Sequence, residues 1–173
     1  MRLTRVTPPA ELPVGIDLAM RHCRVDDAGE VALVQAALEG AVSWLDGRGG
    51  VLGRCLINQV WQADCARCDG HILLPFSDAR DITVTGDNDA PVGFRAQDVR
   101  GRVWVTPTGG WHRGIRVRFT SGYGTRAEDV PPALRSAILL LTGFLYDNRG
   151  SAPAGDLPRE VESLITPFRL RRI

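Results

Sequence analysis

The longest apolar stretch of the chain, Val130–Gly150, predicts a helix that is covered on several sides. Proline has φ fixed near the helical value and lacks an amide hydrogen, so Pro131–Pro132 suits a first helical turn. Residues 137–141 are all apolar, and Gly150 suits the left-handed position beyond the last turn. A helix that is apolar on nearly every face must be buried by a sheet, other helices or another copy. Its apolar run ends well before the roughly 20 residues that a membrane span requires.

Two further helices are predicted nearer the N-terminus. Val14–Cys23 has an imperfect apolar face and predicts a short helix. Asp27 followed by Glu30 has the spacing of a capping box, with Asp in place of Ser or Thr, and predicts the start of a stronger helix. Its apolar positions recur at steps of three and four: Val31, Val34, Leu38, Ala41 and Leu45. The glycines within residues 47–50 should end this helix.

The periodicity changes to that of β-strands between Gln59 and Gly122. The predicted strands are Val60–Ala63, His71–Pro75, Asp81–Thr85, Gly93–Gln97, Arg102–Thr106 and Ile115–Thr120. The first two should be neighbours across a polar turn. In the last strand, alternation places Ile115, Val117 and Phe119 inward and the intervening arginines outward. Short strands with short polar turns are typical of an antiparallel sheet.

These elements predict an α+β fold. We expect a small helical bundle around a long central C-terminal helix, with an inserted antiparallel β-sheet region. The 173 residues should form a single domain, with helices in 14–50 and 130–166, a β-rich insertion at about 58–122 and a flexible C-terminal tail, 167–173. A brief helix, Leu157–Ile165, should precede the tail. A chain of this length can bury roughly two thirds of its unfolded surface.

The charge balance gives little support to nucleic-acid binding by bulk electrostatics. All 21 basic residues are arginine, and 20 acidic residues leave a formal charge of +1. Residues 1–6 lack the apolar core of a signal peptide, which predicts a cytoplasmic product. In that compartment, we expect the four cysteines to be reduced thiols rather than a disulfide framework.

The strongest chemical candidate is the segment that contains Cys65, Cys68 and His71. Two thiols separated by two residues and followed by a histidine have the ligand types and spacing of a zinc site. A fourth ligand could come from Cys55, or from His22 or Cys23. Structural zinc sites usually pair two such knuckles, however, and the sequence contains one. We therefore favour a thiol-bearing turn and predict no metal site.

The pattern expected of an enzyme is missing from the sequence. None of His22, His71 and His112 has a nearby Ser or Cys in the context of a nucleophile elbow. The segment Ser121–Gly124 lacks the lysine and the spacing of a phosphate-binding loop, so we interpret it as a turn. We predict no catalytic residues and no cofactor.

The C-terminal segment alternates apolar side chains with arginine. Such a segment is either a frayed terminus or a docking peptide that becomes ordered on an acidic or grooved partner. Direct contact with nucleic acid is a third interpretation. The residues concerned are Phe168, Arg169, Leu170, Arg171 and Arg172.

Several segments, taken in order, resemble the head–tail connector (adaptor) proteins of long-tailed bacteriophages and of phage-like gene transfer agents. They are His22–Asp27, Leu52–Leu56 with Gln59 and Trp61, Ile72–Pro75, Gly122–Gly124, Val130–Pro131, Leu134–Arg135, Ala137–Leu140, Tyr146–Arg149 and Leu164–Arg169. No single segment is specific, but their order and spacing along the whole chain are. The glycine-rich residues 46–50 and the segment 65–71 depart from the family pattern.

The resemblance implies a non-enzymatic structural protein that forms a ring, usually dodecameric, beneath the portal protein. Such a ring extends the DNA channel and meets the stopper or other tail-side connector protein, while DNA only passes through. Free protein could be monomeric. We expect no membrane association, and a location in the bacterial cytoplasm during assembly and then at the head–tail junction of a phage or phage-like particle. The alternative function is a small zinc- or nucleic-acid-binding module that uses Cys65, Cys68 and His71.

Two groups of functional residues are predicted, the first from the resemblance and the second from the pattern of the central helix. Family members dock their C-terminal segment onto the portal, which by position corresponds to Pro167, Phe168, Arg169, Leu170, Arg171, Arg172 and Ile173. The core and subunit-packing positions of the central helix are Leu134, Ile138, Leu141, Phe144, Leu145 and Tyr146. The polar interruptions Arg135, Thr142 and Gly143 should mark a side of this helix that is open to a neighbouring subunit.

Overall fold

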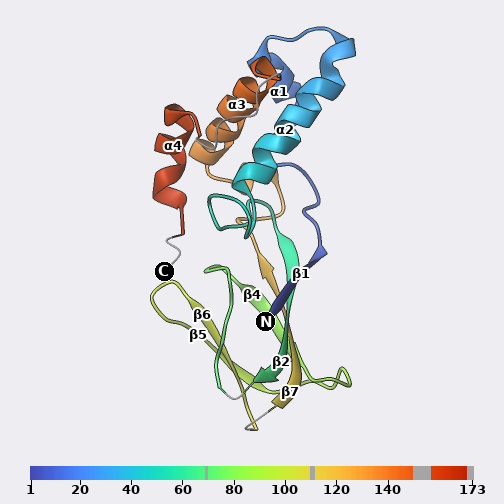
Figure 1. Cartoon of the computed structure of the whole chain (residues 1–173), viewed down its shortest axis with the longest axis vertical. Coiled ribbons are helices and arrows are strands. Elements are labelled where there is room, and N and C mark those ends of the chain that lie inside the picture. Colours follow the sequence, from blue (N-terminus) through green and yellow to red (C-terminus); the bar gives the residue numbers. More distant parts are fainter. Residues whose placement is uncertain (69, 110–111, 150–156, 171–173) are drawn as a thin grey trace. The chain divides into compact units, whose positions relative to one another are not determined.

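The computed structural model describes residues 1–68, 70–109, 112–149 and 157–170, and its fold is α+β, as predicted (Figure 1). It divides into two compact units. The β unit comprises Met1–Ala10 and Asn58–Gly122, and the helical unit comprises Glu11–Ile57 and Tyr123–Ile173. The chain therefore passes from one unit to the other three times.

In the helical unit, α3 is the helix against which the others pack. Figure 1 shows α3 between α2 and α4, and α1 also contacts it. The helices are α1 (Ile16–Cys23), α2 (Val31–Leu45), α3 (Pro132–Asp147) and α4 (Arg159–Ile165). Single 3-10 turns precede α2, precede α3 and follow α4: η1 (Ala28–Glu30), η2 (Ala127–Asp129) and η3 (Thr166–Phe168).

The predicted long central C-terminal helix is shorter than expected, and the brief helix predicted after it is present as α4. Pro132 occupies the first turn of α3, as predicted, and α3 spans 16 residues against 15 in α2. At its end, the Asn148 side chain donates to the Phe144 carbonyl oxygen (2.8 Å) and Arg149 Nε to the Tyr146 carbonyl oxygen (2.9 Å). These side chains satisfy carbonyl groups of the last turn. Gly150 lies outside the described residues.

The apolar stripe of α2 forms half of the helical core. Val34, Leu38, Ala41 and Leu45 are fully buried against α3, as the spacing predicts. Val31 is 39% exposed, so its assignment to the buried stripe was wrong. The α-helix begins only at Val31, after the turn η1, and this first residue lies beyond the packed face.

Only one half of the predicted capping box is present. The Asp27 carboxylate accepts a hydrogen bond from the Gly29 amide (2.8 Å) and caps η1. The Glu30 carboxylate instead accepts one from the Tyr146 hydroxyl (2.6 Å), and Arg149 Nη1 lies 3.2 Å from the same oxygen. The hydrogen bond to Glu30 is the main reason that the pKa of Tyr146 is raised. Glu30 therefore joins the start of α2 to the end of α3.

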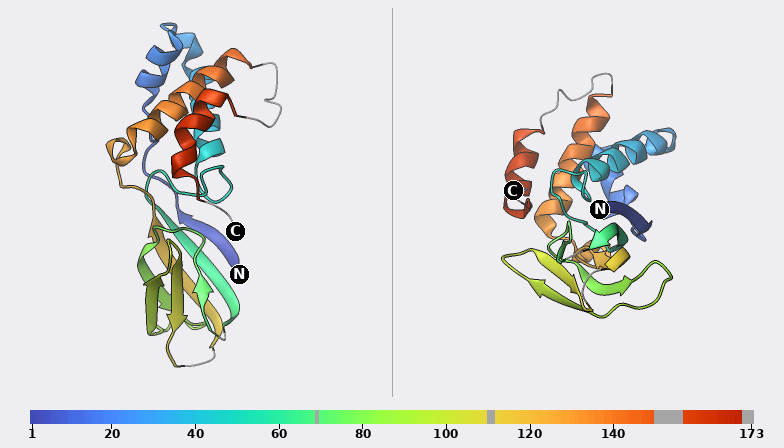
Figure 2. Two further views of the ribbon diagram at one scale, coloured as in Figure 1. Left: turned by 90° about the vertical axis from the view of Figure 1, so that its left-hand side faces the viewer. Right: turned by 60° about the horizontal axis from the view of Figure 1, so that its bottom comes forward.

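The β unit consists of two antiparallel sheets. The four-stranded sheet has the order β1-β2-β7-β4, and the three-stranded sheet has the order β3-β6-β5. Figure 2 shows β1 alongside β2. The strands are β1 (Arg2–Thr7), β2 (Gln59–Cys68), β3 (Ile72–Leu73), β4 (Arg80–Thr85), β5 (Phe94–Asp98), β6 (Val103–Pro107) and β7 (His112–Ser121).

The six predicted strands are present, but one predicted pairing is wrong and one strand was missed. The segments predicted to pair across a turn lie in different sheets, because β2 continues through Cys68 and pairs with β1 and β7, while β3 pairs with β6. The missed strand is β1, in which Leu3 is the only side chain that is even partly buried. It therefore lacks the apolar alternation by which strands are recognised.

The core of the β unit lies on the inward face of β7, as the alternation predicts. Ile115, Val117 and Phe119 are each at most 1% exposed. The Phe119 ring lies 6.1 Å from that of Phe76, which in turn lies 5.3 Å from Trp61, between ring centroids. Such tilted aromatic pairs contribute about 0.5–1.5 kcal/mol beyond the area that they bury.

A hydrogen-bond network centred on Asp78 and Arg80 joins the start of β2 to the end of β7. The Asp78 carboxylate accepts from the Ser121 hydroxyl and from the Gly122 amide, both at 2.7 Å. Arg80 donates to the Gly122 carbonyl oxygen (2.9 Å) and to Asn58 Oδ1 (2.6 Å). The residue before β2 and the residue after β7 are thus held by two neighbouring side chains.

Replacing Asp78 should destabilise the β unit measurably. The change Asp78→Ala leaves the buried Ser121 hydroxyl and the Gly122 amide without their acceptor, at an expected cost of about 1–3 kcal/mol. Asp78→Asn keeps one acceptor oxygen and should lose less. Urea denaturation of the three proteins measures the difference, and equal stability of all three would contradict the structural role of this carboxylate.

Candidate docking surfaces

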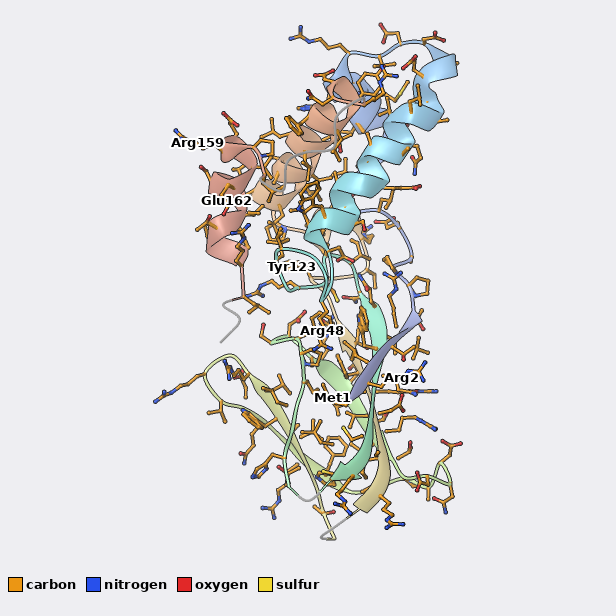
Figure 3. The ribbon with its side chains drawn as sticks, in the orientation of Figure 1. Met1, Arg2, Arg48, Tyr123, Arg159 and Glu162 are labelled. Carbon is orange, nitrogen blue, oxygen red and sulfur yellow. The ribbon has the colours of Figure 1, made fainter. Side chains whose placement is uncertain are left out.

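The described part of the C-terminal tail is attached to the helical unit by side-chain and backbone hydrogen bonds. Arg54 Nε donates to the Phe168 carbonyl oxygen at 2.7 Å, and the Leu170 amide donates to the Leu52 carbonyl oxygen at 3.0 Å. Arg169 forms a bidentate ion pair with Glu162 of α4, with N–O distances of 2.5 and 2.8 Å. The position of Glu162 on α4 is shown in Figure 3.

The loop after α2 provides the other side of this attachment. Gly53 has φ of +65°, a left-handed value that favours glycine, and a Cβ there would lie 3.6 Å from the Leu170 Cβ. Asp46 stabilises the loop by accepting a hydrogen bond from the Leu56 amide at 2.7 Å. The Gly-Arg pair in the segment 52–56 therefore contributes a turn and a guanidinium group that binds the tail.

These contacts involve only part of the predicted portal-docking segment. Pro167 is in η3 and is exposed, and Phe168 packs in part against the helical core. Arg171, Arg172 and Ile173 lie outside the described residues. The docking role of the segment and the flexibility of its end therefore stay predictions. Sequence reasoning did not identify Arg54 and Glu162, whose partners become neighbours only in the folded chain.

The six predicted packing residues of α3 fall into two groups. Leu134, Ile138 and Leu141 are fully buried inside the subunit, and Phe144, Leu145 and Tyr146 are half-buried at the edge of the same core. The first group is thus committed to the subunit's own fold. A role of the second group in contacts between subunits stays a prediction.

Of the three polar residues expected on an open side of α3, Thr142 does not lie on such a side. Thr142 is fully buried, and its hydroxyl donates to the Ile138 carbonyl oxygen at 2.8 Å, so this part of the prediction was wrong. A hydroxyl that bonds within its own helix needs no solvent or partner. Arg135 and Gly143 are half-buried. Among the described residues of the helical unit, the exposed large apolar side chains are Leu18, Val31, Leu33 and Leu140.

The three candidate zinc ligands have separate environments in the β unit. Cys65 and Cys68 are three residues apart on β2, and positions three apart lie on opposite faces of a strand. Cys68 Sγ lies 3.5 Å from the Gly70 carbonyl oxygen, and His71 Nδ1 lies 2.7 Å from Thr106 Oγ1. Within the described ranges, no three His, Cys, Asp or Glu side chains are grouped to hold a metal ion.

All four cysteines carry free thiols, as predicted. Burial is the main factor that raises the pKa of Cys65, and it likewise raises the pKa of Cys23, where Asp147 adds to the effect. Both thiols are therefore protonated near neutral pH, whereas nucleophilic attack and metal binding need the thiolate. The fourth-ligand candidates His22, Cys23 and Cys55 belong to the helical unit.

Among the described residues, no helix is long and apolar enough to cross a membrane.

The Gly122–Gly124 segment is a turn into η2 and α3, as interpreted from the sequence. The Tyr123 amide donates to the Leu56 carbonyl oxygen at 3.1 Å, and Tyr123 packs in part against the helical core. At Gly124, a Cβ would lie 2.1 Å from the Asp129 carboxylate, which accepts a hydrogen bond from the Arg126 amide at 2.9 Å. This close approach explains why glycine is needed at that position.

Comparison with solved structures finds the same fold over the whole length of the chain. A chain from the neck of an empty gene transfer agent (GTA) particle with C6 symmetry has a TM-score of 0.79 and 21% sequence identity. A chain from the virion of the native GTA particle gives 0.77 and 19%, and one from the neck of the native particle with C12 symmetry gives 0.73 and 19%. Each match covers 100% of this chain and 97% of the other. No family model matches the sequence, and no curated protein matches it. At these identities the similarity establishes a shared fold.

Proposed function

We propose that the protein is a head–tail adaptor of a phage or phage-like particle. Copies of the chain assemble as a ring beneath the portal protein, extend the DNA channel and bind the stopper or another tail-side connector protein. The observation that carries the proposal is the likeness, over 100% of this chain and 97% of each matched chain, to chains of GTA necks and virions. Both the β unit and the helical unit fall within that coverage.

The symmetry of those particles supports a ring. The matched necks were computed with C6 and C12 symmetry, and a dodecamer is compatible with both. The role is structural and non-enzymatic, and DNA only passes through the channel. The protein would be made in the bacterial cytoplasm and would then reside at the head–tail junction.

The tail attachment suggests how the ring binds the portal. Arg54, Leu52 and Glu162 hold the chain up to Leu170, so the segment that follows starts from a fixed point on the helical unit. We propose that residues 167–170 position the docking segment and that Arg171, Arg172 and Ile173 provide its contacts with the portal. Two arginines suit an acidic surface, and the terminal isoleucine suits a small apolar groove.

Electron microscopy of the protein mixed with its portal tests this function. We expect extra ring-shaped density on one end of the portal, with the symmetry of a dodecamer. In a producing strain that lacks the protein, we expect DNA-filled heads without tails. Normally tailed particles in that strain would rule out an adaptor role. A solution monomer would not, because assembly on the portal concentrates the subunits.

A further inference from the structure

We propose that neighbouring copies in the ring bind each other through two different surfaces, a basic and aromatic face on the β unit and an acidic, aliphatic surface at the start of α2. The proposal rests on the proposed function, because a closed ring of more than two copies repeats one head-to-tail contact. Such a contact joins two different patches of the same protein. The first surface is here called the Trp104 face, and the second the α2 entrance.

The Trp104 face is the outer side of the three-stranded sheet. Val103 and Val105 of β6 are 7% and 0% exposed, so they point into the core and Trp104 points outward. Directly opposite Trp104 are Gln97 of β5 and Leu73 of β3. The same side of the sheet carries Arg95, Thr106, His71, Arg102 and Val99.

The hairpin that carries this face is held in one conformation at its tip. Two backbone hydrogen bonds of 2.8 and 3.2 Å connect Val99 and Arg102 across the turn. The two residues between them, Arg100 and Gly101, have φ of 55° and 73°, which is typical of a tight type I′ turn. Val99 and Arg102 are therefore presented by a rigid support.

The composition of the Trp104 face is that of a binding surface for an acidic protein patch. Val99 is 48% exposed and Trp104 is partly exposed, which gives the face an apolar centre. Arg95 and Arg102 flank this centre, and neither forms an ion pair in the part of the chain that the structure describes. Tryptophan and arginine are enriched in protein interfaces. Asp98 is paired with the inward-facing Val103, and its carboxylate accepts a hydrogen bond from the Gly101 amide.

The α2 entrance has the complementary chemistry. Val31 and Leu33 are 39% and 43% exposed, although both are large aliphatic residues in a well-formed helix. Asp26 and Asp27 precede them and are exposed, and so is Arg24, while the nearby Arg149 is paired with Glu30. Aliphatic side chains bordered by carboxylates fit an aromatic centre bordered by arginines. The Trp104 face cannot fit a second copy of itself equally well, because its arginines would repel each other.

Photo-crosslinking in complete particles tests the pairing. We expect a photoreactive benzoylphenylalanine at position 99 to give a crosslinked dimer of this protein, with the attachment mapped to residues 24–35. The same group at Thr83, an exposed residue of the other sheet, is the matched control and should not attach there. The inference would be overturned if position 99 crosslinked to DNA, to another protein or to a part of this protein outside residues 24–35. A lack of any crosslink would overturn it too. Absence of the protein from particles would instead contradict the proposed function.

A charge exchange tests the same pairing of surfaces if benzoylphenylalanine at position 99 prevents assembly. We expect Arg102→Glu to reduce the yield of tailed particles by about tenfold or more, because it places a carboxylate against carboxylates. Adding Asp26→Arg to that variant should restore most of the yield. Both variants should fold, because Asp26 is exposed and Arg102 is only half-buried beside the hairpin turn. A defect in Arg102→Glu that Asp26→Arg leaves unchanged would overturn the pairing, as would a normal yield from Arg102→Glu alone.

Discussion

Removal of residues 171–173 is expected to abolish tail attachment while leaving the free energy of unfolding within about 0.5 kcal/mol of the full-length value. The reason is that this deletion leaves in place the contacts by which Phe168, Arg169 and Leu170 are attached to the helical unit. The measurements are urea denaturation of the purified protein and electron microscopy of particles from a producing strain. Heads without tails are the expected product.

A longer deletion, from Phe168 onward, measures how much the tail attachment contributes to the stability of the helical unit. It also removes the partners of Arg54, Glu162 and Leu52, so it should lower the free energy of unfolding by about 1–3 kcal/mol, at about 1 kcal/mol for each hydrogen bond. A variant in which 171–173 are replaced by Ser-Gly-Ser controls for length. Normal tail attachment by the protein that lacks residues 171–173 would show that these residues do not dock onto the portal. This holds whatever the stability of the longer deletion.

The change Leu141→Ala should destabilise the helical unit by about 2–5 kcal/mol. Leu141 is fully buried where α3 meets the core, so its removal loses apolar burial and leaves a cavity. Loss of helical circular dichroism in urea measures the effect on this unit. A single two-state fit should be checked first, since two compact units can unfold separately.

Leu140→Ala is the matched control for that measurement. It makes the same chemical change at the next position of the same helix, so helix propensity cancels between the two variants. Leu140 is 38% exposed, and its replacement should cost about 1 kcal/mol or less. Equal losses from the two variants would show that burial in α3 is not what stabilises the unit.

Local patterns in the sequence predicted the elements well, because helices and strands follow from the spacing of apolar residues. The α2 and β7 faces were confirmed residue by residue, apart from Val31. Strand β1 could not be predicted, since its side chains are almost all exposed and its pairing is made by backbone groups. Nothing in the side-chain pattern of such a strand distinguishes it from an extended lead-in.

The candidate site was harder to predict because its contacts connect distant parts of the chain. Arg54 and Phe168 are separated by 114 residues, and Glu30 and Tyr146 by 116. At Glu30, the local capping rule predicts one partner, and the folded chain provides another. The prediction of a thiol-bearing turn was wrong for a related reason: spacing alone does not show that strand β2 continues through Cys65 and Cys68.

The order in which the two units appear along the chain has a consequence for biosynthesis. The β unit needs residues on both sides of the first helical segment, and the helical unit is interrupted by residues 58–122. Neither unit can therefore be completed until most of the polypeptide has left the ribosome. The tail attachment forms after these, because Phe168, Arg169 and Leu170 follow all the strands and α-helices of the described chain. A polypeptide that stops before Phe168 would lack this attachment even if both units had folded.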